Sequence, residues 1–558
     1  MSSDQPGRVF VVGLDGATFD LLKPWIEAGH LPTLEKLARE GCTGRMTTTV
    51  PPVTAPAWSS FMTGKNPGKH GLYDFRKRTQ GSYDLVPVSS ANRDGRTIWD
   101  IIGQAGRRVI VVNVPMTYPP QPVNGLMITG MLTPRGRDNF TYPPGLRKEL
   151  EERIGKYIIF PEEVYAKGQV DDFLGSLYQA ATKRWEAVRY LMREYPWDFF
   201  MVVFNETDMI QHGLWSCMDA GHPCHDSAES HLYGDAILKF YQWMDQALAE
   251  IVAELDSNTL LMVMSDHGAG PLHSFMYVNN LLADLGLLQF KKQPLARLKR
   301  PLFKLGVTPR NVYALLLKMG LGRLRRSLDK RRGGYSLLRK LFLSFSDVDW
   351  SRTEAYSVGP IGQIYVNLKG REPQGIVHPG EEYERVRTRI SNALEALSNP
   401  RSGESLVDHI YKKEELYWGK HLDDAPDIVF LPRRLETVAL GDFEFPSNCL
   451  IEPAYGISGH HRMEGILLLS GKDIRRGVEL HEAEITDLAP TILYALDIPV
   501  PEDMDGNVLR QAFDESSLNI RPVRYSDSSS GTLHPMSEYT EEDEEEIVER
   551  LRGLGYLG

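Results

Sequence analysis

Short, continuous runs of apolar residues recur along the chain, and each run stops at polar residues. A helical spacing of apolar positions, Phe19, Leu22 and Ile26, follows the first run, so this segment predicts a strand, a loop and a helix. Continuous apolar runs are typical of strands that are buried on both faces of a parallel sheet. The pattern predicts an α/β fold with a mainly parallel central sheet, whose ligands gather at the carboxyl ends of the strands. The four runs are Arg8 to Leu14, Arg107 to Val114, Asp198 to Phe204 and Thr259 to Met264.

A basic block interrupts this pattern between residues 291 and 340. It contains 16 Lys or Arg residues and one acidic residue, Asp329. Leu315, Leu317 and Leu321 lie among the basic side chains, which predicts short basic amphipathic helices inserted into the main domain. Two interpretations stay open. The block is either a solvated cap packed on the core or an element that faces an anionic membrane surface or an anionic substrate.

The C-terminal end predicts a capped helix. Thr540 precedes an acidic first turn, and Ile547, Leu551 and Leu554 follow at helical spacing. The apolar stripe favours a helix that docks on the rest of the protein. We assign it no chemistry.

Composition and charge exclude some classes of protein. Of 558 residues, 42% are hydrophobic and 25% are charged, as in ordinary globular proteins. The formal net charge of -11 gives no reason to expect a nucleic-acid polymer as a partner. The four cysteines, Cys42, Cys217, Cys224 and Cys449, are too few for a disulfide framework, which favours a reducing compartment. The sequence shows no cationic leader and no apolar segment of about 18 residues, so we expect a cytoplasmic protein. Contact with an anionic membrane through residues 291–340 stays open as an alternative. The sequence does not specify an oligomeric state.

Asp and His side chains gather at the ends of the predicted strands. Asp15 ends the first strand, although an Asp-Gly pair taken alone is more often a simple turn. Asp208 and His212 follow the third strand, and on a helix their i, i+4 spacing puts both on one face, able to share a cation; a surface ion pair is the alternative. Asp266 and His267 end the fourth strand in a glycine-containing turn that could bring both to one ion.

A histidine pair, His460 and His461, lies just before a further predicted strand, Ile466 to Leu469. One of the two could be a metal ligand and the other its neighbour or a substrate contact, whereas a lone histidine is more often structural. The four clusters contain no cysteine. Oxygen and nitrogen ligands of this kind suit zinc or manganese better than copper or an iron-sulfur cluster.

The segment from Pro51 to Gly64 offers a hydroxyl nucleophile, Thr54, in a proline-rich loop that runs into a helix. With its continuation, Asn66 to Gly71, this segment resembles the nucleophile segment of the type I phosphodiesterase and nucleotide pyrophosphatase family, within the alkaline phosphatase superfamily. The resemblance continues in chain order at Gly13 to Gly16, Asp208 and His212, Ser265 to Gly268, Gly459 to Arg462, Ile485 to Leu493 and Pro499 to Gly506.

The resemblance implies an alkaline-phosphatase-like three-layer αβα sandwich with a mainly parallel central sheet and an inserted basic, mostly helical cap. The predicted division is a first part of the catalytic core at residues 1–285, the basic insert at 286–345, a second part of the core at 346–515, and a tail with a terminal helix at 516–558.

The resemblance also implies two divalent metal ions, zinc or, as the alternative, manganese. His461 is preferred over His460 as a ligand, because the family pattern looks like Gly-x-His-Arg. Coordination would deprotonate the Thr54 hydroxyl, which has no dedicated base, for attack on phosphorus through a phosphothreonine intermediate. The implied ligands are Asp208, His212 and His461 for one ion, and Asp15, Asp266, His267 and the Thr54 oxygen for the other.

One position departs from the family. Its nucleotide pyrophosphatases typically have Asn three residues after the nucleophile, where the side chain binds a phosphoryl oxygen, and this chain has Ala57. Candidates for the missing contact are backbone amides near Thr54, Ser59, His460 or a basic residue of the insert. Nucleotide specificity is therefore not carried over.

We expect a metal-dependent phosphodiesterase or phosphohydrolase that cleaves a phosphodiester or phosphomonoester bond of its substrate. A phosphoryl or phosphoalcohol transferase, in which a hydroxyl acceptor replaces water, is the alternative within the same chemistry. Sulfatase activity is disfavoured, because Thr54 cannot be converted to formylglycine. A non-catalytic binding subunit in envelope-polymer assembly is the alternative from another class, and the complete ligand set argues against it.

Overall fold

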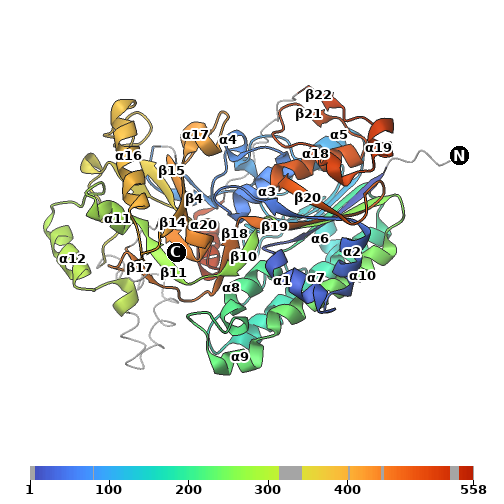
Figure 1. Ribbon diagram of the computed structural model, residues 1–558, viewed down its shortest axis with the longest axis horizontal. Coiled ribbons are helices and arrows are strands. Elements are labelled where there is room, and N and C mark those ends of the chain that lie inside the picture. Colours follow the sequence, from blue (N-terminus) through green and yellow to red (C-terminus); the bar gives the residue numbers. More distant parts are fainter. Residues whose placement is uncertain are drawn as a thin grey trace.

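The computed structural model describes residues 7–79, 81–312, 342–399, 403–441, 445–527 and 539–556. Its main feature is a nine-stranded sheet with the strand order β20-β2-β19-β9-β1-β8-β5-β6-β7 (Figure 1). In chain order the strands are β1 (Arg8–Leu14), β2 (Cys42–Thr47), β5 (Val109–Val114), β6 (Gly125–Thr129), β7 (Thr141–Tyr142), β8 (Phe199–Phe204), β9 (Thr259–Met264), β19 (Glu464–Gly471) and β20 (Val478–Glu484).

The four predicted apolar runs form the centre of this sheet, in the order β9-β1-β8-β5, and all are parallel. In this register Val11 lies between Met201 and Met262. Every residue of β5, β8 and β9 is buried, because helices cover both faces. Strand β19 is antiparallel to both of its neighbours, and β7 is antiparallel to β6 at the far edge. The predicted α/β fold with a mainly parallel central sheet is confirmed.

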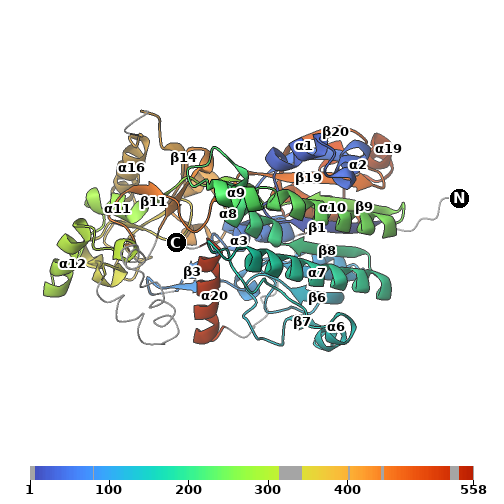
Figure 2. The same ribbon diagram turned by 90° about the horizontal axis from the view of Figure 1, so that it is seen from below.

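Helices form a layer on each side of the sheet (Figures 1 and 2). The helices pack on the sheet through apolar stripes. The longest, α7, has buried side chains at helical spacing, namely Phe173, Leu177, Ala181 and Val188. One layer contains α1 (Phe19–Glu27), α2 (Pro32–Glu40), α7 (Val170–Glu194) and α10 (Ala236–Glu254), and the other contains α3 (Thr54–Thr63), α5 (Ile98–Gln104) and α18 (Leu488–Ala495).

A second lobe lies beside one end of the sheet and has its own hydrophobic cluster, which runs from Met276 to Phe445 (Figure 1). Short strands build it, in a four-stranded antiparallel sheet and a separate three-stranded sheet. The predicted division at residues 285, 345 and 515 stays a prediction. The elements of the lobe are β11 (Ser274–Tyr277), α11 (Val278–Asp284), α12 (Pro294–Lys304), β12 (Ala355–Ser357), β13 (Gln363–Val366), α16 (Glu381–Glu395), β14 (Val407–Lys412), β15 (Ile428–Pro432), β16 (Thr437–Leu440) and β17 (Ile451–Pro453).

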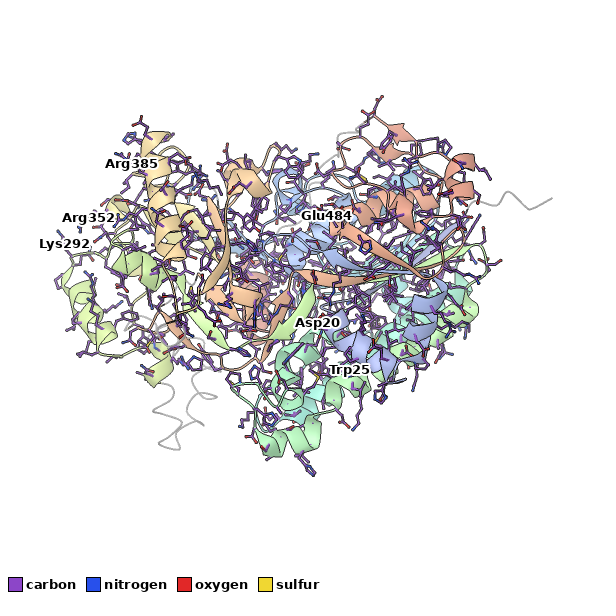
Figure 3. The ribbon with its side chains drawn as sticks, in the orientation of Figure 1. Asp20, Trp25, Lys292, Arg352, Arg385 and Glu484 are labelled. Atoms are coloured by element: carbon purple, nitrogen blue, oxygen red, sulfur yellow. The ribbon has the colours of Figure 1, made fainter. Side chains whose placement is uncertain are left out.

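The described part of the basic block is residues 291–312, which include helix α12. Lys299 on this helix is buried and donates to both carboxylate oxygens of Asp347, at 3.1 and 2.9 Å, whereas Lys292 projects at the outer edge of the lobe (Figure 3). The leucines at 315, 317 and 321 lie outside the described residues. Within the described ranges, no helix has the length and apolar character needed to cross a membrane.

The predicted terminal helix is confirmed as α20 (Glu541–Gly553). The Thr540 side chain accepts from the Asp543 N–H, and the Asp543 side chain accepts from the Thr540 N–H, so the cap is reciprocal. Ile547 and Leu551 are fully buried. The helix therefore docks on the rest of the protein, as its apolar stripe predicts.

Candidate active site

The predicted site residues come from separate segments that meet at the carboxyl ends of β1, β8 and β9. Asp15 follows β1, Asp266 and His267 follow β9, and Thr54 is the first residue of α3. Asp208 and His212 lie on α8 (Glu206–Met218), directly after β8, so the predicted helical spacing is confirmed. His461 lies on β18 (Gly459–Arg462), which pairs with β10 (Gly268–Pro271) and so lies against the turn after β9. All of these residues are buried.

One group consists of Asp208, His212 and His461. The His212 Nε2 atom lies 3.1 Å from Asp208 Oδ2 and 3.1 Å from His461 Nε2. The His461 Nε2 atom lies 3.7 Å from Asp208 Oδ1. Three side chains that are far apart in sequence thus point their ligand atoms at one position.

Backbone carbonyls fix the tautomers of both histidines in this group. His212 Nδ1 donates to the carbonyl of Gly459 at 2.7 Å, and His461 Nδ1 donates to the carbonyl of Pro52 at 2.8 Å. Because a carbonyl only accepts, each neutral ring has its lone pair on Nε2. Two lone pairs then face each other beside a carboxylate, which is a stable arrangement only when a proton or a cation lies between them.

A second group contains Asp15, Asp266, His267 and Thr54. The His267 Nε2 atom lies 3.2 Å from Thr54 Oγ1, 3.3 Å from Asp266 Oδ2 and 3.6 Å from Asp15 Oδ1. His267 Nδ1 donates to the Gly268 carbonyl at 3.0 Å, so the lone pair again lies on Nε2. Among the described residues, Asp15 Oδ1 and Asp266 Oδ2 are buried and have no hydrogen-bond partner. Unpaired buried carboxylate oxygens of this kind fit a cation.

Gly16 allows the two groups to approach each other. Its φ of +66° is in the left-handed region, and a β-carbon at this position would lie 2.7 Å from Asp208 Oδ1. Its N–H donates to Asp266 Oδ1 at 3.3 Å. A glycine is needed here both for its conformation and for the space that Asp208 occupies.

Burial and mutual repulsion shift the pKa values of the carboxyl groups. Burial, and then the charge of Asp208, raises the pKa of Asp15 to about 8. Burial, and then the charge of Asp15, also raises the pKa of Asp266. Burial opposes ionisation of Asp208, but His212 outweighs it and lowers the pKa of Asp208. Neighbouring carboxylates in a buried space repel each other unless cations neutralise them.

Two sets of three residues each bring their ligand atoms within 4.8 Å of one another, namely Asp208, His212 and His461, and Asp15, Asp208 and His267. Asp208 therefore lies between the two groups. The residues that the family resemblance assigned to two ions are brought together in one continuous cluster.

A family model described as type I phosphodiesterase / nucleotide pyrophosphatase matches residues 9–442, which is most of the chain. The chain belongs to this family. Membership of the type I phosphodiesterase / nucleotide pyrophosphatase family indicates a phosphoester hydrolase. No curated protein matches the chain.

The solved structures to which this type I phosphodiesterase family member is similar have low sequence identity to it. Phosphonoacetate hydrolase from Sinorhizobium meliloti 1021, in complex with phosphonoformate, is 16% identical, with a TM-score of 0.49 over 88% of this chain and 95% of that one. Human ectonucleotide pyrophosphatase / phosphodiesterase 5 is 13% identical, with a TM-score of 0.46 over 92% of this chain and 99% of that one.

The two side chains named as candidates for the missing phosphoryl contact, Ser59 and His460, differ in whether they have a free donor in this family member. Ser59 Oγ donates to the Ala55 carbonyl at 2.7 Å, one turn back on α3, so its hydrogen is already used. His460 Nε2 is buried and has no hydrogen-bond partner among the described residues. The His460 ring lies 4.5 Å from the His461 ring, between centroids. His460 thus has a nitrogen available near the cluster, and Ser59 does not offer its hydroxyl.

Sequence reasoning missed Tyr556. Its hydroxyl donates to Asp208 Oδ2, and its ring lies 5.4 Å from the ring of His212. It also missed Asn205, which donates to Asp15 Oδ2 at 2.5 Å. An Asn directly before a helix, such as Asn205, is typical of a helix cap and does not indicate a contact with Asp15. Nothing in the sequence around Tyr556 indicates its partner, which lies 348 residues away.

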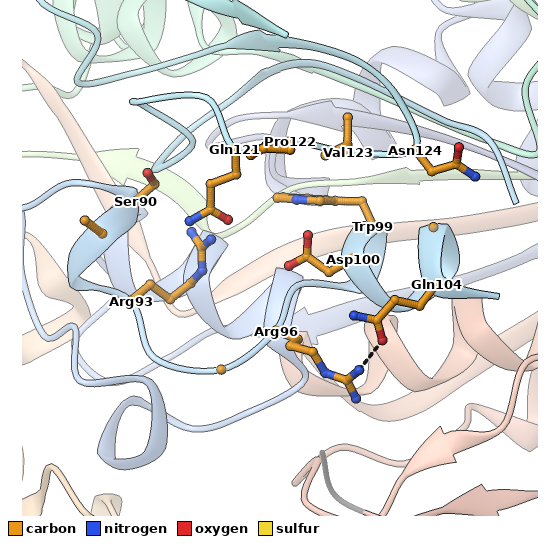
Figure 4. A pocket seen from close by; sticks show the side chains of 13 residues that line it. Ser90, Arg93, Arg96, Trp99, Asp100, Gln104, Gln121, Pro122, Val123 and Asn124 are labelled. Carbon is orange, nitrogen blue, oxygen red and sulfur yellow. Dashed lines mark hydrogen bonds between the residues drawn. The ribbon is translucent and has the colours of Figure 1, made fainter. Parts of the chain in front are cut away.

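A separate cavity of about 250 Å³ opens next to α5 (Figure 4). Its lining includes Arg93, Trp99 and Gln121, and Arg96 donates to Gln104 at its rim. None of the predicted metal ligands lines this cavity, so it is distinct from the candidate active site.

Proposed function

We propose that this chain is a two-metal phosphoester hydrolase in which Thr54 attacks phosphorus. The observation that carries the proposal is the pair of Nε2 atoms of His212 and His461, which face each other at 3.1 Å beside Asp208. A single proton could serve only one of these contacts at a time. A divalent cation would serve all three ligands together.

The residues present fit two divalent ions, zinc or, as the alternative, manganese. Asp208, His212 and His461 would hold one ion, and Asp15, Asp266, His267 and the Thr54 oxygen would hold the other. When bound, the ions supply positive charge that lowers the pKa of the Thr54 hydroxyl and stabilises charge on the phosphoryl oxygens.

Thr54 needs such activation because its neighbour is a weak base. The lone pair on His267 Nε2 accepts from the Thr54 hydroxyl at 3.2 Å. Burial lowers the pKa of His267 to about 4, so the imidazole alone does not hold the hydroxyl proton at neutral pH. Once the Thr54 hydroxyl has lost its proton to solvent, its oxygen forms a bond to phosphorus while the ester P–O bond breaks, and the leaving oxygen takes up a proton from solvent and departs as the alcohol. Water then attacks phosphorus, the phosphothreonine P–O bond breaks, and the Thr54 oxygen regains a proton.

The N-terminus of α3 supplies donors for the phosphoryl group in place of the missing Asn. Thr54 begins this ten-residue helix, whose first N–H groups have no acceptor within the helix and lie at the positive end of its dipole. Pro56 has no N–H, and the Ala57 N–H donates to the Val53 carbonyl at 3.1 Å. We therefore assign the phosphoryl contact to the Ala55 N–H, with the His460 ring as a second donor.

Metal analysis combined with two chromogenic substrates tests this proposal. The purified protein, loaded with Zn²⁺ or Mn²⁺, is assayed on bis-p-nitrophenyl phosphate and p-nitrophenyl phosphate. We expect two bound ions per chain and metal-dependent release of nitrophenol, with the faster substrate identifying the diester or monoester preference. A chain that binds no divalent metal would rule out the mechanism and favour a non-catalytic binding subunit.

Product analysis separates hydrolysis from transfer. The same reaction with an added alcohol acceptor gives free phosphate or a phosphomonoester if water is the acceptor. A phosphorylated acceptor as the main product would instead assign the chain to the transferase alternative.

A further inference from the structure

Tyr556, the last residue that the structure describes, reaches into the candidate metal cluster. The Tyr556 hydroxyl donates to Asp208 Oδ2, and the side chain of Tyr556 is almost completely buried. Its ring centroid lies 5.4 Å from that of His212 and 5.5 Å from that of His461. Tyr556 therefore contacts all three members of one predicted ligand group.

Helix α20 carries Tyr556 to this position and is held firmly in place. Arg137 forms an ion pair with Asp543 in the first turn, with a distance of 3.0 Å from Nε to Oδ1. Near the end of the helix, Arg550 donates to the Thr133 carbonyl at 3.0 Å. Figure 2 shows α20 at the lower edge of that view, between the second lobe and the helices that cover the sheet. The anchoring fixes the direction in which the chain leaves the helix.

A left-handed glycine then turns the chain into the site. Gly555 has a φ of +86°, and the Tyr556 N–H donates back to the Leu551 carbonyl at 3.0 Å, which closes the end of α20. A β-carbon on Gly555 would lie 2.7 Å from the Ile457 side chain. The backbone conformation at Gly555 thus determines where the Tyr556 side chain lies.

We propose that Tyr556 is a positioning residue for the metal ligand Asp208, an inference that rests on the proposed function. The phenol holds Oδ2 of the carboxylate, while Oδ1 faces His461 Nε2 at 3.7 Å. With one oxygen held, the carboxylate keeps one orientation, and its remaining lone pairs point at the position that the histidines share. Such hydrogen bonds to metal ligands typically improve metal affinity by about 10- to 100-fold.

The variant Tyr556→Phe tests this role, because it removes the hydroxyl and keeps the ring. Tyr539→Phe is the matched control: Tyr539 lies directly before Thr540, the N-cap of α20, and its hydroxyl donates to the Leu132 carbonyl at 2.9 Å instead of to a ligand. Zn²⁺ affinity is measured by competition with a chromogenic chelator, and kcat and KM by hydrolysis of bis-p-nitrophenyl phosphate. Thermal unfolding of the metal-free proteins reports the structural effect of each substitution.

For Tyr556→Phe we expect Zn²⁺ affinity to fall by about 10- to 100-fold and kcat to fall with it, while the unfolding temperature of the metal-free protein changes no more than in Tyr539→Phe. Wild-type Zn²⁺ affinity in Tyr556→Phe would overturn the proposal and leave Tyr556 a packing residue. Faster turnover in Tyr556→Phe would also overturn it, since the tail would then obstruct the site. If the wild-type protein binds no metal, the proposed function itself is wrong. If the wild type binds Zn²⁺ and hydrolyses the substrate, and Tyr556→Phe has the same affinity and turnover, only the role of Tyr556 is wrong.

Discussion

At the scale of single residues, the three candidate ligand histidines make the same hydrogen bond. Each donates Nδ1–H to a backbone carbonyl, of Gly459, Pro52 or Gly268, and directs Nε2 toward the carboxylates. The carbonyl acceptors fix both the tautomer and the plane of each ring, so that the Nε2 lone pair is directed at the position of a cation. The backbone around β18 and α3 is thus as much a part of the site as the side chains.

The neighbouring histidines His460 and His461 give a sharp residue-scale prediction. His461→Asn removes a nitrogen that faces Asp208 and His212, so we expect loss of one bound ion and a fall in turnover of at least about 100-fold. Within the part of the chain that the structure describes, the His460 Nε2 atom has no hydrogen-bond partner, so His460→Asn should keep both ions. Metal analysis of the two variants decides the matter. Loss of metal in His460→Asn alone would show that the ligand was assigned to the wrong member of the pair.

Residues with a local signal could be predicted from the sequence, and those without one could not. Helical spacing predicts that Asp208 and His212 share a helix face, and the apolar run before Asp266 places that residue after a strand. Their assignment as metal ligands came from the family resemblance. The carbonyl acceptors Pro52 and Gly459 have no signal, because every residue has a carbonyl. Tyr556 has none either, since its contact with Asp208 depends on how the whole tail docks.

At the scale of elements, burial explains which strands could be recognised. The strands β5, β8 and β9 are buried on both faces and read as unbroken apolar runs. The strands of the second lobe are short, and β14 is partly exposed, so its sequence shows no such run. Their pairing joins distant segments and was therefore not predicted.

Helix α12 carries an element-scale prediction about the basic block. It exposes 60% of Leu298 and, one residue past its end, 81% of Leu305, among basic side chains. If this face contacts an anionic membrane, the protein should co-sediment with phosphatidylserine-containing vesicles at low salt and less at high salt. Replacing both leucines by Ser should weaken binding, whereas Leu232→Ser, at a leucine 65% exposed on α9 (Ser227–Tyr233), should not. No binding by the wild type would favour the solvated cap.

A buried ion cluster in the second lobe predicts a pH dependence of stability. Burial alone would raise the pKa of Asp427, but Arg371, Lys413 and Tyr383 outweigh it and lower that pKa to about 2. Because the folded pKa is below the unfolded value, the stabilisation is fully present above about pH 4 and is lost as the pH falls toward 2. Its size is about 2 kcal/mol.

Urea unfolding of wild type and Asp427→Asn across this range measures the effect. The stability difference between the two proteins should be largest above about pH 4 and should shrink as the pH falls. A difference that stays constant with pH would show that Asp427 has an ordinary pKa in the folded protein.

At the scale of the whole molecule, the cluster joins distant parts of the chain. Asp15 lies near the start, His461 beyond the second lobe, and Tyr556 in the tail, and all meet at the carboxyl end of the sheet. The strand runs predict this sheet and its functional edge, but not the strand order or the docking of lobe and tail, which depend on long-range packing.

Metal removal should therefore weaken the whole fold. A ligand present at 1,000 times its dissociation constant stabilises a protein by about 4 kcal/mol, so chelation with EDTA should lower the unfolding temperature and added Zn²⁺ should restore it. In His461→Asn the shift caused by EDTA should be smaller than in wild type. The same unfolding temperature with and without EDTA would argue against a metal bound at the cluster.

The measurement that most directly tests the central claim is hydrolysis of bis-p-nitrophenyl phosphate by Thr54→Ala. Thr63→Ala, which removes another buried hydroxyl from the same helix, is the control. The claim predicts that Thr54→Ala stays folded but loses turnover by at least about 1,000-fold, while Thr63→Ala keeps it. Wild-type turnover in Thr54→Ala would contradict the assignment of Thr54 as the nucleophile.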